Sequence, residues 1–339
     1  MTASLAHAAS FAPGIGIAAA PGLPDNAIEL SGLTKIYRPR GKGKPVTALD
    51  HIDLAVPRGS VFGLLGPNGA GKSTLINILA GIVVKTSGSA HIWTHDIDRE
   101  PRLSRSAIGI VPQELTLDPF FTPREILELQ AGLYGVPKKE RRTQEILEAV
   151  GLADKGDAYA RTLSGGMRRR LMVAKAMVHS PPILVLDEPT AGVDVELRRH
   201  LWAYVRRLNE GGTTILLTTH YLEEAQEMCD QIAIINRGTV VANEPTETLL
   251  KRIDAKQITV TLADALAILP PDLAALGMEL LDPTHLHFSY RPTRAALGPA
   301  LAKIAEAGLT IHDVTTEETD LQDIFLGLTA SPTEGTLAQ

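Results

Sequence analysis

Eight consecutive residues could hold phosphate groups. The stretch 66–73 reads GPNGAGKS, which matches the pattern GxxxxGK[ST]. In such a loop, successive backbone N–H groups turn inward to cradle phosphate oxygens, and the helix that follows adds the positive end of its dipole. We expect the Lys72 ammonium to reach the β- and γ-phosphates and the Ser73 hydroxyl to ligate magnesium. The sequence therefore predicts a nucleotide site formed by Gly66, Pro67, Asn68, Gly69, Ala70, Gly71, Lys72, Ser73 and Thr74.

Two carboxylates follow one another at the end of an apolar run. Residues 183–188 read ILVLDE, which is typical of a buried strand that ends in acidic residues. Such a strand places Asp187 at the carboxyl edge of a sheet, where it can hold the magnesium shell. Glu188 then points at the γ-phosphate and could orient or deprotonate an attacking water. The alternative, an acidic strand end at an ordinary turn, is weakened by the phosphate loop upstream.

The surrounding pattern predicts the elements that position these residues. Short, continuous apolar runs at 61–65, 183–186 and 214–217 are typical of buried parallel strands. Helical stretches alternate with them, for instance at 72–80 and 195–208. Strand–helix alternation of this kind predicts an α/β fold with a mostly parallel core sheet. Two further strands, 28–37 and 48–56, precede the phosphate loop and predict an antiparallel β subdomain.

An all-helical insert interrupts this alternation. The stretch 122–125 reads TPRE, which is a capping box with proline at the first helical position. Apolar residues then recur at helical spacing at Ile126, Leu129 and Leu133. We expect a helical subdomain at about 118–180.

The pattern changes again after residue 250. Strands are expected at 257–262, 286–290 and 310–315, with helices at 294–307 and 321–328, as in a small α+β domain. The predicted organisation is a flexible arm at 1–26, a nucleotide-binding domain at 27–250, a C-terminal α+β domain at 251–330 and a tail at 331–339.

Composition excludes several classes of protein. The chain has 339 residues, enough for about two domains. Its formal net charge of −6 gives no electrostatic reason to expect a nucleic-acid partner, since proteins that bind nucleic acids usually have a basic face. A single cysteine, Cys229, excludes an intrachain disulfide, and we expect it to be an inert packing residue. The first basic residue is Lys35, which argues against a signal peptide.

A third motif gives the chain a family resemblance. Residues 163–167, LSGGM, lie just ahead of Asp187 and resemble the signature of the ATP-binding-cassette (ABC) family, whose other features occur here in the family's order. The resemblance covers about residues 28–242. The matching positions are Tyr37 for the adenine-stacking aromatic, Gln113 for the Q-loop, Leu163, Ser164, Gly165, Gly166 and Met167 for the signature, Asp194 for the D-loop and His220 for the switch histidine.

The resemblance implies how these residues act. The signature caps the γ-phosphate of ATP held by the opposite subunit, so hydrolysis requires a head-to-tail homodimer. Gln113 joins the magnesium shell, and His220 contacts the γ-phosphate. Met167 departs from the usual glutamine, which puts one contact across the dimer in doubt. Each position also has a plain alternative: Tyr37 as an ordinary strand aromatic, Gln113 as a surface residue and His220 as a structural histidine.

Two stretches narrow the resemblance. Residues 219–225 (THYLEEA) and 320–326 (DLQDIFL) are similar to those of bacterial drug, polysaccharide or lipo-oligosaccharide exporter ATPases, which carry a C-terminal extension. This likeness implies an ATPase subunit that uses ATP and Mg²⁺, works with a separate membrane permease, and lies on the cytoplasmic face of the cell membrane. An importer ATPase with a regulatory C-terminal domain and a soluble, non-transport ABC ATPase are the alternatives.

Basic residues cluster at 138–142 and 168–170. Solvated helix faces are the expected interpretation of both runs. The alternative is a surface that docks near a membrane partner or anionic headgroups.

Overall fold

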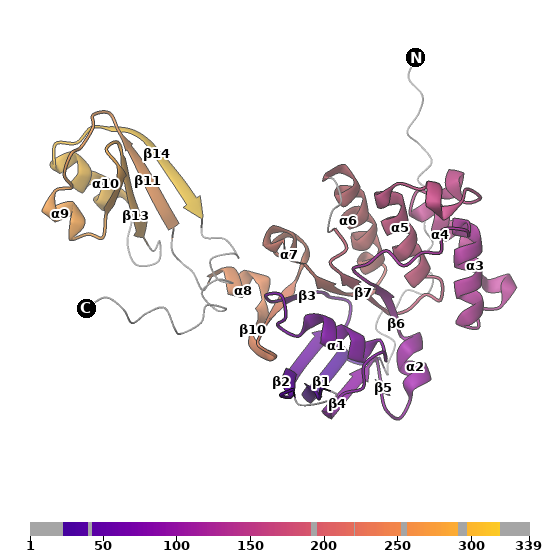
Figure 1. Cartoon of the computed structure of the whole chain (residues 1–339). Coiled ribbons are helices and arrows are strands. Elements are labelled where there is room, and N and C mark those ends of the chain that lie inside the picture. Colours follow the sequence, from indigo (N-terminus) through magenta and orange to yellow (C-terminus); the bar gives the residue numbers. More distant parts are fainter. Residues whose placement is uncertain are drawn as a thin grey trace, which may run out of the picture. The chain divides into compact units, whose positions relative to one another are not determined.

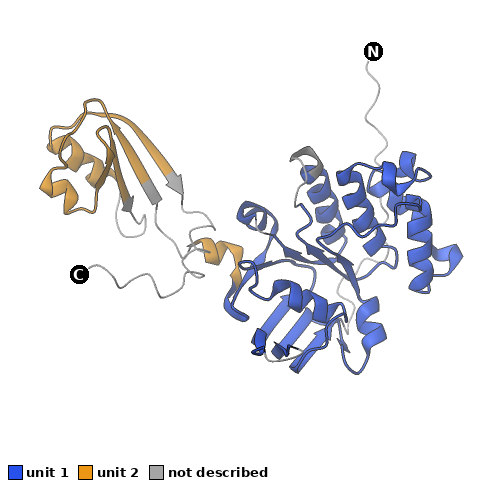
Figure 2. Ribbon diagram, in the orientation of Figure 1, with its two compact units in different colours: residues 1–243 blue, residues 244–339 orange. Residues whose placement is uncertain are grey.

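A computed structural model describes residues 23–39, 43–190, 195–219, 221–251, 256–290 and 297–318 (Figure 1). Asp194, His220, the expected helix at 321–328 and most of the expected arm and tail lie outside the described residues. The chain divides into two compact units, residues 1–243 and 244–339 (Figure 2). Each unit is described by itself below.

A six-stranded sheet forms the centre of the first unit. Its order is β10 (Thr239–Pro245), β9 (Gln231–Asn236), β3 (Val61–Leu65), β8 (Thr214–Thr218), β7 (Ile183–Asp187) and β6 (Ile108–Val111). The pairings from β9 across to β6 are parallel. Every residue of β3 and β8 is buried, because helices cover both faces of a parallel sheet. The predicted α/β class with a parallel core is confirmed.

A second, antiparallel sheet covers one side of this unit. Its order is β2 (Val46–Pro57), β1 (Asn26–Tyr37), β4 (Ser87–Ile92) and β5 (His95–Asp96). Helix α1 (Lys72–Leu79) packs between the two sheets, since its Leu75 and Ile78 share one hydrophobic core with Leu54 of β2 and Phe62 of β3. Figure 1 shows α1 above the strands β1 and β2. The phosphate loop therefore lies where both sheets meet.

Helices gather beyond β6 as the expected helical subdomain (Figure 1). They are α3 (Pro123–Leu133), α4 (Thr143–Ala149) and α5 (Gly165–Ala176). The predicted capping box of α3 is present: the Glu125 N–H donates to Thr122 Oγ1 at 3.2 Å, and the Thr122 N–H donates to the Glu125 carboxylate at 2.8 Å. The remaining helices of the first unit are α2 (Pro101–Ser106), α6 (Val195–Glu210) and α7 (Leu222–Met228), and α8 (Thr246–Lys251) opens the second. Among all helices of the described residues, none is both long and apolar enough to cross a membrane.

The second unit has a topology that sequence patterns did not reveal. Along the chain it runs β11 (Lys256–Leu262), α9 (Pro271–Ala274), β12 (Glu279–Asp282), β13 (His285–Tyr290), α10 (Leu297–Glu306) and β14 (Ile311–Glu318). The sheet order is β12-β13-β11-β14 with every pairing antiparallel, which is the split βαβ arrangement of ferredoxin-like domains. Ile258, Val260 and Phe288 of the strands share a core with Leu273 of α9 and Ile304 of α10. The unit thus has a hydrophobic core of its own.

Candidate functional site

The phosphate loop forms an open pocket between β3 and α1. Its volume is about 590 Å³, and it is lined by residues 68–74 together with Ala48, Gln113 and Glu188. Gly71 caps α1 with φ of 115°, and a Cβ at this position would lie 2.5 Å from the Ala48 carbonyl oxygen. Only glycine fits there, because the backbone is left-handed and the neighbouring strand is too close for a side chain. The loop can therefore present its backbone N–H groups to an anion.

The Lys72 ammonium lies folded over this loop. Its Nζ donates to the carbonyl oxygens of Gly66 at 2.6 Å and Pro67 at 3.2 Å. Burial lowers the pKa of Lys72, while the carboxylates of Glu188 and Asp187 oppose that shift. A partly desolvated cation gains most from an anionic partner, so phosphate oxygens entering the loop would stabilise its charged form.

Asp187 ends β7 beside the end of β8. The Thr218 hydroxyl donates to Asp187 Oδ1 at 2.6 Å, as the parallel register of the two strands allows. Burial raises the pKa of Asp187, and the hydrogen bond from Thr218 counteracts that rise. A carboxylate that is costly to keep charged is well suited to bind a cation.

Glu188 and Gln113 meet at the pocket, although 75 residues separate them. Gln113 Nε2 donates to Glu188 Oε2 at 2.9 Å. Glu188 has φ of 47°, a left-handed conformation that is costly for a non-glycine residue. Its N–H is held by the carbonyl and hydroxyl oxygens of Thr218, each at 3.1 Å. The surrounding structure thus fixes this strained backbone and aims the carboxylate at the pocket.

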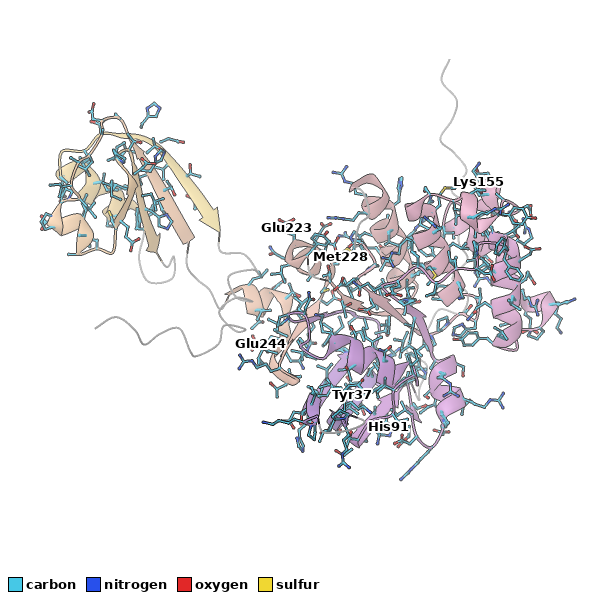
Figure 3. All side chains as sticks on the ribbon, in the orientation of Figure 1. Tyr37, His91, Lys155, Glu223, Met228 and Glu244 are labelled. Carbon is cyan, nitrogen blue, oxygen red and sulfur yellow. The ribbon has the colours of Figure 1, made fainter. Side chains whose placement is uncertain are left out.

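Other predicted site residues lie outside this pocket's lining. Tyr37 lies at the end of β1, 41% exposed, with the Lys35 ammonium 4.8 Å from its ring centroid. Figure 3 places Tyr37 on the antiparallel sheet. The signature forms the N-terminus of α5, where Ser164 accepts a hydrogen bond from the Met167 N–H at 3.3 Å. Ser164 and Gly165 are exposed, so this helix N-terminus is open to a partner outside the chain.

For the basic run 168–170, the expected solvated helix face is wrong at its central residue. Arg169 is only 5% exposed. Its Nη1 donates to the carbonyl oxygens of Pro112 at 3.0 Å and Gln113 at 2.8 Å. One signal could have found it: Arg169 shares helical spacing with the buried residues Met172, Val173 and Ala176. A charge on the buried stripe of a helix indicates a specific partner.

Glu224 is a second buried charge that the sequence patterns missed. It is 6% exposed and accepts hydrogen bonds from the Thr190 hydroxyl at 2.8 Å and the Thr219 hydroxyl at 2.9 Å. Arg198 Nε lies 3.3 Å from its other oxygen. Thr190 follows β7 and Thr219 follows β8, so Glu224 joins the segments that leave the carboxyl ends of these two strands.

The donor atoms of the predicted magnesium ligands suit this ion. Ser73 supplies a hydroxyl, Gln113 an amide and Asp187 a carboxylate, all oxygen donors of the kind Mg²⁺ prefers. Among the described residues, no group of three His, Cys, Asp or Glu side chains could hold a metal ion. The donor set fits Mg²⁺ in company with the phosphate oxygens of a nucleotide, which is its usual mode of binding.

Comparisons with known proteins agree with this geometry. Residues 49–191 match the ABC transporter family. The chain is 37% identical to the daunorubicin/doxorubicin resistance ATP-binding protein DrrA of Streptomyces peucetius, over 92% of this chain and 94% of that protein. It is 36% identical to the Nod factor export ATP-binding protein I of Ralstonia nicotianae, over 94% and 96% respectively. The dimeric cassette MJ0796, solved with ADP and phosphate, superposes with a TM-score of 0.58 at 26% identity, covering 65% of this chain and 98% of that one.

Proposed function

This chain belongs to the ATPase subunits of ABC transporters, and from that premise we propose that it drives export through a separate membrane permease. It binds ATP and hydrolyses it to ADP and phosphate, and the reaction is coupled to transport. The names of its relatives, a drug-resistance protein and a Nod factor exporter, support export over import. Selectivity for the cargo would belong to the permease, and this chain would lie at the cytoplasmic face of the membrane, bound to that permease.

The contact between Gln113 and Glu188 at the phosphate-loop pocket is the observation that carries the proposed chemistry. The loop N–H groups and Lys72 would bind the phosphates of ATP and stabilise the charge that develops on the γ-phosphate. Glu188 would orient the attacking water and accept its proton. Gln113 would hold the Glu188 carboxylate in place.

Magnesium would join ATP at the oxygens of Ser73, Asp187 and Gln113. When bound, the ion neutralises negative charge on the β- and γ-phosphates. Thr218 would keep the Asp187 carboxylate oriented through the 2.6 Å hydrogen bond.

The complete site would need two copies of the chain, head to tail. The exposed N-terminus of α5, with Ser164 and Gly165, is suited to bind the γ-phosphate of ATP held by the other copy. Tyr37 would stack on adenine, Asp194 would contact the partner copy and His220 would sense the γ-phosphate. These roles are proposals that the family likeness supports.

Replacing Glu188 by glutamine tests the proposed chemistry. We expect Glu188→Gln to retain ATP binding and to lower steady-state hydrolysis by at least about a hundredfold, because the water loses its base. Glu210→Gln, on an exposed residue at the end of α6, is the matched control and should hydrolyse ATP normally. Near-normal hydrolysis by Glu188→Gln in a pure preparation would contradict the assignment.

A further inference from the structure

Neighbouring arginines on α5 reach two different parts of the first unit. Arg170 Nη1 donates to the carbonyl oxygens of Val150 at 2.6 Å and Gly151 at 3.2 Å, at the end of α4. Arg169 instead donates to the carbonyl oxygens of Pro112 and Gln113. The two side chains use the same chemistry, a guanidinium on main-chain carbonyls, but only Arg169 holds a segment of the candidate site.

Burying the Arg169 guanidinium has an unfavourable free energy of desolvation. Burial lowers its pKa, and the nearby carboxylates of Asp187 and Glu188 oppose that shift. Charged groups are rarely this buried unless they are fully hydrogen-bonded or paired. Its third contact is to the Glu188 carbonyl oxygen, 3.5 Å from Nη2. One cation therefore lies among the backbones of the two residues that meet at the pocket, and it interacts electrostatically with the carboxylates of Asp187 and Glu188.

The contacts form a continuous path from the signature to the pocket. Ser164 caps α5, and Arg169 lies on the second turn of the same helix. Arg169 fixes the backbone of Gln113, and the Gln113 side chain donates to the Glu188 carboxylate at 2.9 Å. Because an α-helix is stiff over two turns, a shift of its N-terminus moves Arg169 with it. The position of the signature and the orientation of Glu188 are then mechanically linked.

We propose that Arg169 is a positioning residue for hydrolysis, which ties the signature helix to Gln113 and through it to Glu188. The inference rests on the proposed role of Glu188. Engagement of the signature by ATP on the partner copy would set the position of α5, and Arg169 would pass that setting to the residues that handle water. Hydrolysis then depends on Arg169 after ATP has bound.

The first test compares Arg169→Lys with Arg170→Lys in the full chain. Lysine keeps the charge but supplies a compact point donor in place of the planar fork, so it cannot hold two carbonyls in the same geometry. We expect Arg169→Lys to lower kcat about tenfold while the KM for ATP stays within about twofold, because the interaction acts after binding. Arg170→Lys, with a matching loss of carbonyl contacts, should change kcat by less than about twofold.

The second test is a double-mutant cycle with Gln113→Ala. If Arg169 acts through Gln113, Arg169→Lys should cost less than about twofold in kcat once the Gln113 side chain is gone. Rates are expressed per ATP-binding subunit, so that a loss of folded protein does not enter the comparison. A full tenfold cost in the Gln113→Ala background would overturn the inference, since the two residues would then act independently.

Two further outcomes would also overturn it. An equal fall in kcat for Arg169→Lys and Arg170→Lys would make Arg169 a packing residue, as would a fall for Arg169→Lys that disappears once rates are expressed per ATP-binding subunit. Glu188→Gln separates this failure from failure of the proposed function. If Glu188→Gln stops hydrolysis while the cycle is additive, the role of Glu188 stands and only the link through Arg169 is wrong.

Discussion

The two units of the chain use their sheets differently. In the first unit β3, β7 and β8 are parallel, so their carboxyl ends lie at one edge. That edge brings together Lys72 at the start of α1, Glu188 just after β7 and Thr218 at the end of β8. In the second unit every strand pairing is antiparallel, so strand ends alternate between the two edges. A parallel sheet concentrates the residues of a site at one edge. We therefore expect phosphate chemistry in the first unit and accessory contacts from the second.

The largest effect is expected at the signature of the first unit. Ser164→Arg places a bulky cation on the exposed N-terminus of α5, where it should block the phosphate of the partner copy. We expect hydrolysis to fall by at least about a hundredfold and the ATP-induced dimer to be lost, while the single subunit binds ATP normally. Steady-state rates, size-exclusion chromatography and nucleotide titration measure the three quantities.

The informative control for this variant is its nucleotide affinity as a monomer. Loss of ATP binding by monomeric Ser164→Arg would contradict a signature that acts across the dimer. It would instead indicate that the signature contributes to the site of its own chain, or that the variant is misfolded.

Acid should destabilise the first unit through His179. Burial lowers the pKa of His179 to about 4, and its ring stacks on Tyr134 with centroids 3.7 Å apart. Because the unfolded histidine takes up a proton near pH 6.5 and the folded one only near pH 4, the free energy of unfolding falls as the pH drops from 6.5 toward 4. At pH 5 this loss amounts to about 2 kcal/mol relative to pH 7.

His179→Phe keeps a stacked ring but removes the titration. Denaturant unfolding of the first unit at pH 7 and pH 5 should show that the variant lacks this acid-dependent loss. The second unit provides the contrast: N–H and side-chain hydrogen bonds from Thr284, with the bond to His285, lower the pKa of Asp282 to about 2, so this group stays charged at pH 5. Equal acid sensitivity of wild type and His179→Phe would show that His179 is not the cause.

Two matched substitutions, one in the core of each unit, should show whether the two units unfold in separate transitions. Ile183 of β7 and Ile258 of β11 are both fully buried strand residues. Replacing either by valine removes one methylene and should cost about 1 kcal/mol. We expect Ile183→Val to lower the melting transition that nucleotide stabilises, and Ile258→Val to lower the other. A single transition shifted by both variants would mean that the chain unfolds as one unit.

Short-range patterns predicted much of the site. The phosphate loop, the strand ending in Asp187 and the capping box at Thr122 each lie within a few residues, so the sequence carries them directly. The role of Gln113 in the magnesium shell came only from the family resemblance, and its contact with Glu188 was not predicted. Its direct hydrogen bond depends on the parallel pairing of β6 with β7, which no local pattern encodes.

Features decided by distant contacts were missed. Strand β6, with the sequence IGIV, has four residues and a glycine, too little for a strand pattern. Arg169 belongs to a run of three arginines, and only the approach of the Pro112 and Gln113 carbonyls makes its burial favourable. Glu224 is buried because hydroxyls from two separate turns converge on it. In the second unit β11 likewise pairs with β14, about fifty residues further along the chain. Sequence periodicity predicts that a segment is a strand, but it does not predict which distant strand it pairs with.

The most direct test of the contrast between the units is ATP binding by a chain that ends at Leu250. All described residues of the phosphate-loop pocket precede this point. We predict that the shortened chain folds and binds ATP with a Kd within about twofold of the full chain, although its dimer is weaker at low protein concentration. A shortened chain that is folded but has lost ATP binding would contradict the account, because the second unit would then belong to the site.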